Sequence, residues 1–444
     1  MTADSQLSAR SVDHSSESKT FYPPKQIPLM ARLVQSISYV LARVLYKAKL
    51  SVSEESVAKV RAIDSRTRMV LVCNHPTMED GMTLFVLSAR IGQLFHYVVA
   101  YEAFDGLLGW FIQRLGCYSI RRGVGDRTSI SQTLALLKQP DCRLVIFPEG
   151  GCSYQNDTIM PFRPGAIQLP MSVLAQMAKK ALSVEQTPDF IVVPVSLKYR
   201  YRQPMHQVIE KTISRIEERL KITSDLAGSD LAGSDLVSSE PRERNYYRLR
   251  RIANQVILGI EQEAGLVVKN ELNWNQRIDR LRQFFIEKCE RALEIKPNLN
   301  VPIRERVYRV QALLDETESA EGKKSLQTEL LGPEKLTRQE VFWDTVRLLN
   351  FDAIYDGYVA EAPTPERFLD TLTRLEREVF HLEHAQPKAP RKACFYIGDP
   401  INLKDYLEEY QRDRTATIDR LSNQLRATMQ RNLDKMSRPA AEIV

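Results

Sequence analysis

The sequence has few of the features that mark secreted, zinc-binding or membrane-spanning proteins. Its six cysteines are scattered, with no C-x-x-C pair and no zinc-type spacing, which indicates a reducing, cytoplasmic setting. Residues 1–20 are rich in serine and have no apolar stretch, so no secretory signal is expected. No uninterrupted run of about 20 apolar residues is present. We therefore expect a cytoplasmic protein that lies on a membrane at most, as a peripheral protein.

Composition places the chain among ordinary globular proteins. It has 444 residues, of which 43% are hydrophobic and 27% are charged. This length predicts two lobes, or one core with a large insertion. The formal net charge of +6 is a small surplus, and we expect no nucleic-acid partner.

The N-terminal region divides into two parts. The serine content of residues 1–22 predicts disorder. Residues 24–50 carry basic but no acidic residues, and their apolar residues recur at helical spacing. This pattern is typical of a basic amphipathic helix on an anionic membrane surface. A helix packed against the core, with its charges in solvent, would have the same pattern.

Residues 51–200 form the predicted core. Short apolar runs alternate with helical patterns, which predicts an α/β sandwich with a mostly parallel sheet. The expected strands are 69–73, 96–100, 117–120, 143–147 and 190–197, and the expected helices are 79–90, 106–115, 127–138 and 165–182.

The alternation stops at residues 202–390, which are charged and helical in pattern. A tandem Asp-Leu-Ala-Gly-Ser repeat begins at residue 225, and its composition predicts a flexible loop near 224–242. An apolar run returns at 393–398, followed by a helical pattern near 411–435. We interpret 202–390 as a large helical insertion, and 392–440 as the return of the chain to the core.

The most informative segment is Asn-His-Pro-Thr-Met-Glu-Asp at 74–80, directly after the first predicted core strand. Positions five apart do not share a helix face, so His75 and Asp80 can meet only if His75 lies in the turn before the helix. Pro76 favours this, because proline is common at the first helical position. A carboxylate beside an imidazole fixes the tautomer and leaves the other ring nitrogen as a base. The alternative is a purely structural role, in which this segment is an N-cap followed by an ordinary acidic residue on a helix face.

Two further blocks follow two other predicted strands. The first, Gly116–Arg122, ends in two arginines. The second, Phe-Pro-Glu-Gly at 147–150, combines an acid with a turn fixed by proline. Ligands of open α/β sheets bind at strand ends, so both blocks are candidates for the same site.

Together these blocks resemble the phospholipid/glycerol acyltransferase family, which includes lysophosphatidate acyltransferases. Members carry an H-x-x-x-x-D box, a Gly-to-Arg box and an F-P-E-G box in this order. The resemblance continues through Phe-Arg-Pro-Gly at 162–165, the strand containing Pro194 and the turn Gly-Asp-Pro-Ile at 398–401. It covers about 69–200 and 392–405.

The resemblance implies roles for these residues. His75 would deprotonate the acceptor hydroxyl, Asp80 would orient it and Arg122 would bind an acceptor phosphate. The other residues implied in substrate binding are Asn74, Gly116, Glu149, Gly150, Arg163 and Pro194. The acyl donor would be a coenzyme A or acyl carrier protein thioester, the acceptor a lysophospholipid, first of all 1-acyl-glycerol-3-phosphate, and no cofactor would be needed.

The sequence departs from the family at one point. Residues 151–153 are Gly-Cys-Ser, where the family commonly has Thr-Arg-Ser. Arg163 or Arg121 can take the place of the missing basic residue; without such a replacement, an acceptor that is not a phosphate monoester is expected. The alternatives to 1-acyl-glycerol-3-phosphate are glycerol 3-phosphate, another lysolipid and a hydroxylated lipid without phosphate.

Two other classes of function stay open. A non-catalytic lipid-binding protein could retain the fold, although His75, Asp80 and Glu149 argue against it. A metal-dependent hydrolase would need ligands besides His75 and Asp80. His381 and His384 lie three apart, but no acidic or thiol partners complete a metal site, so we expect none.

Overall fold

Most of the predicted apolar runs belong to one sheet of eight strands in the computed structural model. The structure describes residues 21–183, 185–222, 241–269, 271–321, 330–333, 335–352 and 355–437. The order is β1-β9-β6-β2-β5-β3-β4, with β10 beside β6, and most neighbours are parallel. The strands are β1 (Ala48–Val52), β2 (Arg68–Cys73), β3 (His96–Ala100), β4 (Cys117–Ile120), β5 (Arg143–Ile146), β6 (Phe190–Tyr201), β9 (Arg391–Ile397) and β10 (Ile401–Asn402). The predicted α/β class with a mostly parallel sheet is confirmed.

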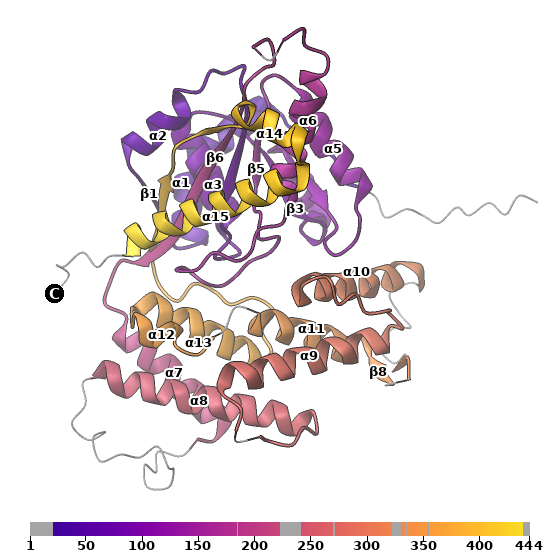
Figure 1. The fold of residues 1–444 in the computed structure, drawn as a ribbon. Coiled ribbons are helices and arrows are strands. Elements are labelled where there is room, and N and C mark those ends of the chain that lie inside the picture. Colours follow the sequence, from indigo (N-terminus) through magenta and orange to yellow (C-terminus); the bar gives the residue numbers. More distant parts are fainter. Residues whose placement is uncertain are drawn as a thin grey trace, which may run out of the picture.

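Helices cover both faces of this sheet (Figure 1). Strand β2 shows why: Met69 and Leu71 pack into one apolar cluster, whereas Val70 and Val72 pack into another on the opposite face. Helices α1 (Pro28–Leu45), α2 (Glu54–Arg61) and α3 (Asp80–Ile91) contribute to the first cluster. The second contains residues of α5 (Arg127–Lys138), α6 (Gly165–Ala178), α14 (Leu407–Arg412) and α15 (Arg414–Ser437).

The helix predicted over 24–50 is shorter in the structure. Helix α1 ends at Leu45, and the following residues form β1 instead. Lys47 has φ +50°, which turns the chain out of the helix. Strand β1 then pairs in parallel with β9, so the sheet begins at Ala48. The pairing partner lies more than 300 residues away, and local periodicity could not reveal it.

The insertion leaves the sheet after β6 and returns at β9. These strands are antiparallel neighbours, and Val195 pairs with Ile397, which confirms the predicted pairing of 393–398 with 190–197. Between them lie α7 (His206–Leu220), α8 (Pro241–Glu263), α9 (Trp274–Ala292), α10 (Ile303–Glu321), α11 (Arg338–Phe351), α12 (Tyr358–Glu361) and α13 (Pro365–Val379), with a short pair of strands, β7 (Leu330–Leu331) and β8 (Leu336–Thr337). These helices form an apolar cluster of their own below the sheet in Figure 1.

Two expectations lie largely outside the described residues. These are the disordered segment 1–22, of which only the last two residues are described, and the loop near 224–242 with its tandem repeat. Helix α8 begins at Pro241, so the last two residues of the predicted loop are helical.

The loop after β5 fastens the insertion to the core. The buried Asp157 carboxylate forms ion pairs with Lys198 of β6 and, at 2.7 Å, with Arg367 of α13. The Asn156 side chain donates to Asp370 at 2.9 Å, and Arg374 donates to the Ser153 carbonyl at 2.6 Å. A change in α13 would therefore alter the contacts of the segment that follows the F-P-E-G block.

Helix α1 shows its apolar side to the solvent. Small and polar residues such as Ala31, Ser38 and Ala42 face the core, whereas large apolar side chains face outward. The outward set, all more than 45% exposed, is Leu29, Leu33, Ile37, Val40, Val44 and Leu45.

Helix α4 (Gly106–Arg114) extends this surface. Leu107 is 87% exposed and Trp110 51%. The chain before α1 lies against the end of α4, where the Ile27 amide donates to the Arg114 carbonyl at 2.9 Å. We call the exposed apolar side chains of α1 and α4 together the apolar face. Among the described residues, no helix combines the length and the hydropathy needed to cross a bilayer.

Candidate active site

His75 and Asp80 meet in the turn between β2 and α3. The His75 Nδ1 atom lies 2.7 Å from the Asp80 Oδ2 atom, which confirms the predicted pairing distance. Pro76 was expected at the first helical position. Helix α3 begins only at Asp80, so Pro76 lies in the preceding turn. The carboxylate accepts a hydrogen bond from Nδ1–H, and the Nε2 atom keeps its lone pair.

The Asp80 carboxylate is fully buried and surrounded by donors. The Thr77 amide donates to Oδ2 at 2.9 Å, and the Thr77 hydroxyl donates to Oδ1 at 2.8 Å. The Tyr199 hydroxyl, from β6, also donates to Oδ1 at 2.8 Å. With hydrogen bonds to both of its oxygens, this buried carboxylate is fixed in orientation.

The loop after β5 holds the His75 main chain from the other side. Glu149 accepts from the His75 amide at 2.9 Å, and the Ser153 amide donates to the His75 carbonyl at 2.8 Å. The Phe147 ring stacks on the imidazole, with centroids 4.3 Å apart. The F-P-E-G block therefore positions the histidine of the H-x-x-x-x-D block.

Glu149 faces protein groups. It is 2% exposed, and its second carboxylate oxygen accepts from the Met160 amide at 3.2 Å. Burial raises the pKa of Glu149 to about 7. Glu149 was predicted to bind substrate; its hydrogen bonds in the structure are with the main-chain amides of His75 and Met160.

A cavity of about 210 Å³ opens beside His75. Its polar end contains His75, Arg122, Gly150 and Arg163, which are four of the predicted site residues. The remainder of its lining is mainly apolar: Val98, Ala100, Ile120, Ile130, Ile146, Phe147, Pro148, Ala166 and Leu169. Four of these residues lie in or at the ends of β3, β4 and β5, whose carboxyl ends share one edge of the sheet. One cavity is thus lined by the His75 imidazole, by two arginine guanidinium groups and by a set of apolar side chains.

Both arginines at the polar end have an acidic neighbour. The Arg122 guanidinium lies 3.4 Å from Glu102, and Arg163 Nε lies 2.6 Å from Glu305 of α10. Gly150 has φ +71°, and a Cβ atom there would lie 2.2 Å from the Arg163 guanidinium carbon. Glycine at this position therefore lets Arg163 lie across the F-P-E-G turn.

Besides Glu149, three predicted substrate-binding residues do not line the cavity, namely Asn74, Gly116 and Pro194. The Asn74 amide is buried and makes both of its hydrogen bonds with the Leu197 main chain, at 2.7 and 2.9 Å. Gly116 precedes β4 and lies at the opposite end of that strand from Arg122. Pro194 lies within β6, opposite Val72 and against Gly398. Their contacts are with the sheet and its connections, and their role in substrate binding stays a prediction.

The sequence reasoning missed several residues of the site. Thr77 and Tyr199 complete the surroundings of Asp80, and Glu305 and Tyr308 approach the arginines from the insertion. Thr77 lies inside the recognised block and could have been considered as a local donor. The others come from distant parts of the chain, and no local pattern marks them.

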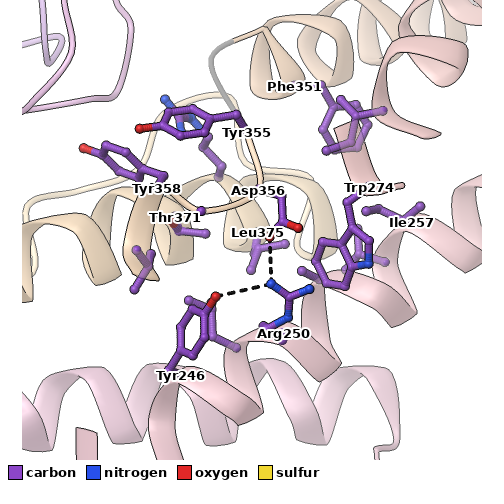
Figure 2. Close-up of a pocket in the computed structure, with 17 residues that line it drawn as sticks. Tyr246, Arg250, Ile257, Trp274, Phe351, Tyr355, Asp356, Tyr358, Thr371 and Leu375 are labelled. Carbon is purple, nitrogen blue, oxygen red and sulfur yellow. Dashed lines mark hydrogen bonds and ion pairs between the residues drawn. The ribbon is translucent and has the colours of Figure 1, made fainter. Parts of the chain in front are cut away.

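A second cavity lies within the insertion, among α8, α9, α11 and α13 (Figure 2). At its edge the Arg250 guanidinium contacts Asp356 at 2.7 Å and the Tyr246 hydroxyl at 3.2 Å, and it stacks over Trp274 at 4.4 Å. Its lining contains none of the predicted site residues. The cavity beside His75 is therefore the candidate active site.

Residues 51–198 match the family model described as Acyltransferase. This segment begins in β1 and ends in β6, and it contains the turn with His75 and the loop after β5. A search among curated proteins finds no match.

The surroundings of Asp80 lead to a stability prediction. Tyr199→Phe is expected to lower the free energy of unfolding by about 1–3 kcal/mol, because a buried carboxylate loses a donor. Tyr118→Phe is the matched control, since its buried hydroxyl contacts only the neutral Thr133, at 2.8 Å. The control should lose about 1 kcal/mol. Chemical denaturation of both variants measures the difference, and an equal or smaller loss in Tyr199→Phe would contradict the role given to Tyr199.

The raised pKa of Glu149 predicts a pH dependence of stability. Its folded value of about 7 lies above the ordinary value of 4.5, so the folded protein holds this proton more tightly than the unfolded chain does. The contribution of Glu149 to stability should therefore fall as pH rises from about 4.5 to 7, by up to about 3 kcal/mol.

Glu149→Gln removes this titrating group. The free energy of unfolding of the variant should therefore fall less steeply with pH than that of the unmodified protein, and any further difference between the two should be the same at every pH. Denaturant unfolding between pH 5 and 8 measures the slope. Glu210→Gln, which changes an exposed acid on α7, should keep the slope of the unmodified protein. Parallel slopes in all three proteins would show that Glu149 titrates normally.

Proposed function

We propose that the protein moves a fatty acyl group from a thioester to a glycerolipid hydroxyl, because residues 51–198 form an acyltransferase domain of the phospholipid/glycerol acyltransferase family. The donor would be acyl-CoA or an acyl carrier protein thioester, and the first candidate acceptor is 1-acyl-glycerol-3-phosphate. The observation that carries the proposal is the His75–Asp80 pair, 2.7 Å apart, beside an apolar cavity with a cationic end.

In the proposed reaction His75 Nε2 accepts the proton of the acceptor hydroxyl. The hydroxyl oxygen attacks the thioester carbonyl carbon, the carbon–sulfur bond breaks, and the leaving thiolate takes the proton from the imidazolium. Asp80 keeps the ring oriented and stabilises its positive charge. Glu149 and Ser153 keep the His75 main chain in place through hydrogen bonds of 2.9 and 2.8 Å. The step needs no acyl-enzyme and no cofactor.

The lining of the cavity supports a lipid substrate with an anionic headgroup. Arg122 and Arg163 lie at one end, and a guanidinium is suited to phosphate because it can donate two parallel hydrogen bonds. The apolar side chains along the rest of the wall suit an acyl chain. Another acceptor stays open, because Arg122 and Arg163 already face Glu102 and Glu305. A non-catalytic lipid-binding role is less favoured, since it would not require the oriented histidine.

The apolar face of α1 and α4 supports peripheral binding to an anionic membrane on its cytoplasmic side. Exposed leucines and a tryptophan are unfavourable in water and would enter the lipid headgroup region. The exposed basic residues around them, Lys25, Arg32, Arg43 and Lys47, complement anionic lipids, and residues 24–50 contain no acid. Free cysteines at all six positions fit a reducing cytoplasm.

His75→Ala tests the reaction. Loss of the base should lower turnover by about 10²–10⁴-fold in an assay of acyl transfer to 1-acyl-glycerol-3-phosphate and to a panel of other acceptors. His206→Ala, at the exposed start of α7, should keep normal turnover. Circular dichroism would verify that both variants fold. Retention of more than a tenth of the turnover by His75→Ala would rule out His75 as the base.

The apolar face can be tested separately from the chemistry. The double variant Leu33→Gln, Val40→Gln should bind vesicles containing phosphatidylglycerol at least about tenfold more weakly, because two exposed apolar side chains no longer enter the lipid. Its activity on a short-chain, water-soluble acceptor should be unchanged. Leu299→Gln, at a 76% exposed position of the insertion, is the matched control and should bind vesicles normally. Undiminished vesicle binding by the double variant would remove α1 from the membrane contact.

A further inference from the structure

Helix α10 of the insertion reaches the cationic end of the cavity. Tyr308 is 3% exposed, and its ring lies under both arginines. The Arg122 guanidinium is 4.7 Å from the ring centroid and the Arg163 guanidinium is 5.5 Å from it. One aromatic side chain of α10 thus holds the two cations that the acceptor headgroup would meet.

The core is shaped to receive α10 at this place. A Cβ atom on Gly151 would lie 1.9 Å from the Tyr308 hydroxyl, and one on Gly123 would lie 2.1 Å from the Tyr308 carbonyl carbon. Arg304, one turn earlier on α10, donates to the Gly151 carbonyl at 3.2 Å and is paired with Asp352 at 2.5 Å. Helix α10 can therefore approach this closely only because two core loops have glycine, which lacks a Cβ atom, at the points of contact.

Glu305 lies on the same turn of α10 and faces Arg163. Its carboxylate is 2.6 Å from Arg163 Nε, and both side chains are 31% exposed, so solvent and ligands can reach the pair. Within the described part of the chain, the Nη2 atom of Arg163 is buried and has no hydrogen-bond partner, so protein groups do not satisfy all the donors of this guanidinium. Arg163 can thus donate to an incoming oxyanion, but Glu305 competes for it.

We propose that α10 forms one wall of the acceptor site and that Glu305 determines the headgroup selectivity of this site. An anionic headgroup that binds Arg163 has to displace the Glu305 carboxylate or lie beside it, at an electrostatic cost. A neutral headgroup leaves the ion pair intact. Glu305 therefore lowers the preference for phosphate-bearing acceptors relative to neutral ones. The inference rests on the proposed function only in identifying the ligand as an acyl acceptor.

Binding measured without any acyl donor tests this selectivity. The probes are a medium-chain 1-acyl-glycerol-3-phosphate and the matching 1-acyl-glycerol, titrated calorimetrically into the full-length protein below their micellar concentrations. Glu305→Gln should bind the phosphate compound about two- to five-fold more tightly, the range expected for a partly exposed ion pair. Its affinity for the neutral compound should not change.

A second variant identifies the group through which Glu305 acts. Arg163→Gln should weaken binding of the phosphate compound, and adding Glu305→Gln to it should produce no further change, because the two side chains act as a pair. Glu210→Gln removes an exposed carboxylate elsewhere on the insertion and should leave both affinities unchanged.

The inference is overturned if Glu305→Gln alters both affinities equally, weakens binding of the phosphate compound, or has the same effect as Glu210→Gln. It is also overturned if neither compound binds to the unmodified protein. These results are distinct from failure of the proposed function. Selective binding without any acyl transfer would contradict the reaction alone, and acyl transfer with an unselective response to Glu305→Gln would contradict the role of Glu305 alone.

Discussion

The fixed position of the His75 main chain is the constraint on which the site depends. Its amide donates to Glu149 and its carbonyl accepts from Ser153, both from the loop after β5. Its ring is fixed by Phe147 on one face and by Asp80 at Nδ1. These contacts leave the imidazole few orientations, so the direction of the Nε2 atom is fixed by the protein alone. His75 and Glu149 are 74 residues apart in the sequence, and their hydrogen bond joins the two blocks in one site.

The parallel strands explain why a histidine, two arginines and an apolar wall occur together. Strands β2, β5, β3 and β4 lie side by side in this order, and their carboxyl ends lie at one edge of the sheet. His75, Phe147 and Arg122 follow three of these ends. The strand residues that line the cavity are apolar, and its polar lining comes from His75, the two arginines, Ser129 and Thr133. A substrate with a charged head and an acyl chain matches this division.

The insertion can be long because its two ends are neighbours. It leaves at Tyr201 and returns at Arg391, and these residues pair across β6 and β9. The helices between them pack around their own apolar core, so the sheet keeps its register. The insertion nevertheless contacts the site: α13 binds the loop after β5, and α10 supplies Glu305 and Tyr308. Helices outside the matched segment thereby contribute side chains beside the two arginines of the cavity.

The sequence by itself determined most of the strands, the turn that brings His75 to Asp80, and the α/β class, because each depends on periodicity or spacing within a few residues. Tertiary structure decided the rest. Strand β1 was missed because its pairing partner, β9, lies far along the chain. Asn74 could not be distinguished from a ligand-binding residue until its amide was seen to bond to β6. Tyr199 and Tyr308 reach the site from distant elements, and contacts between distant residues leave no local pattern in a sequence.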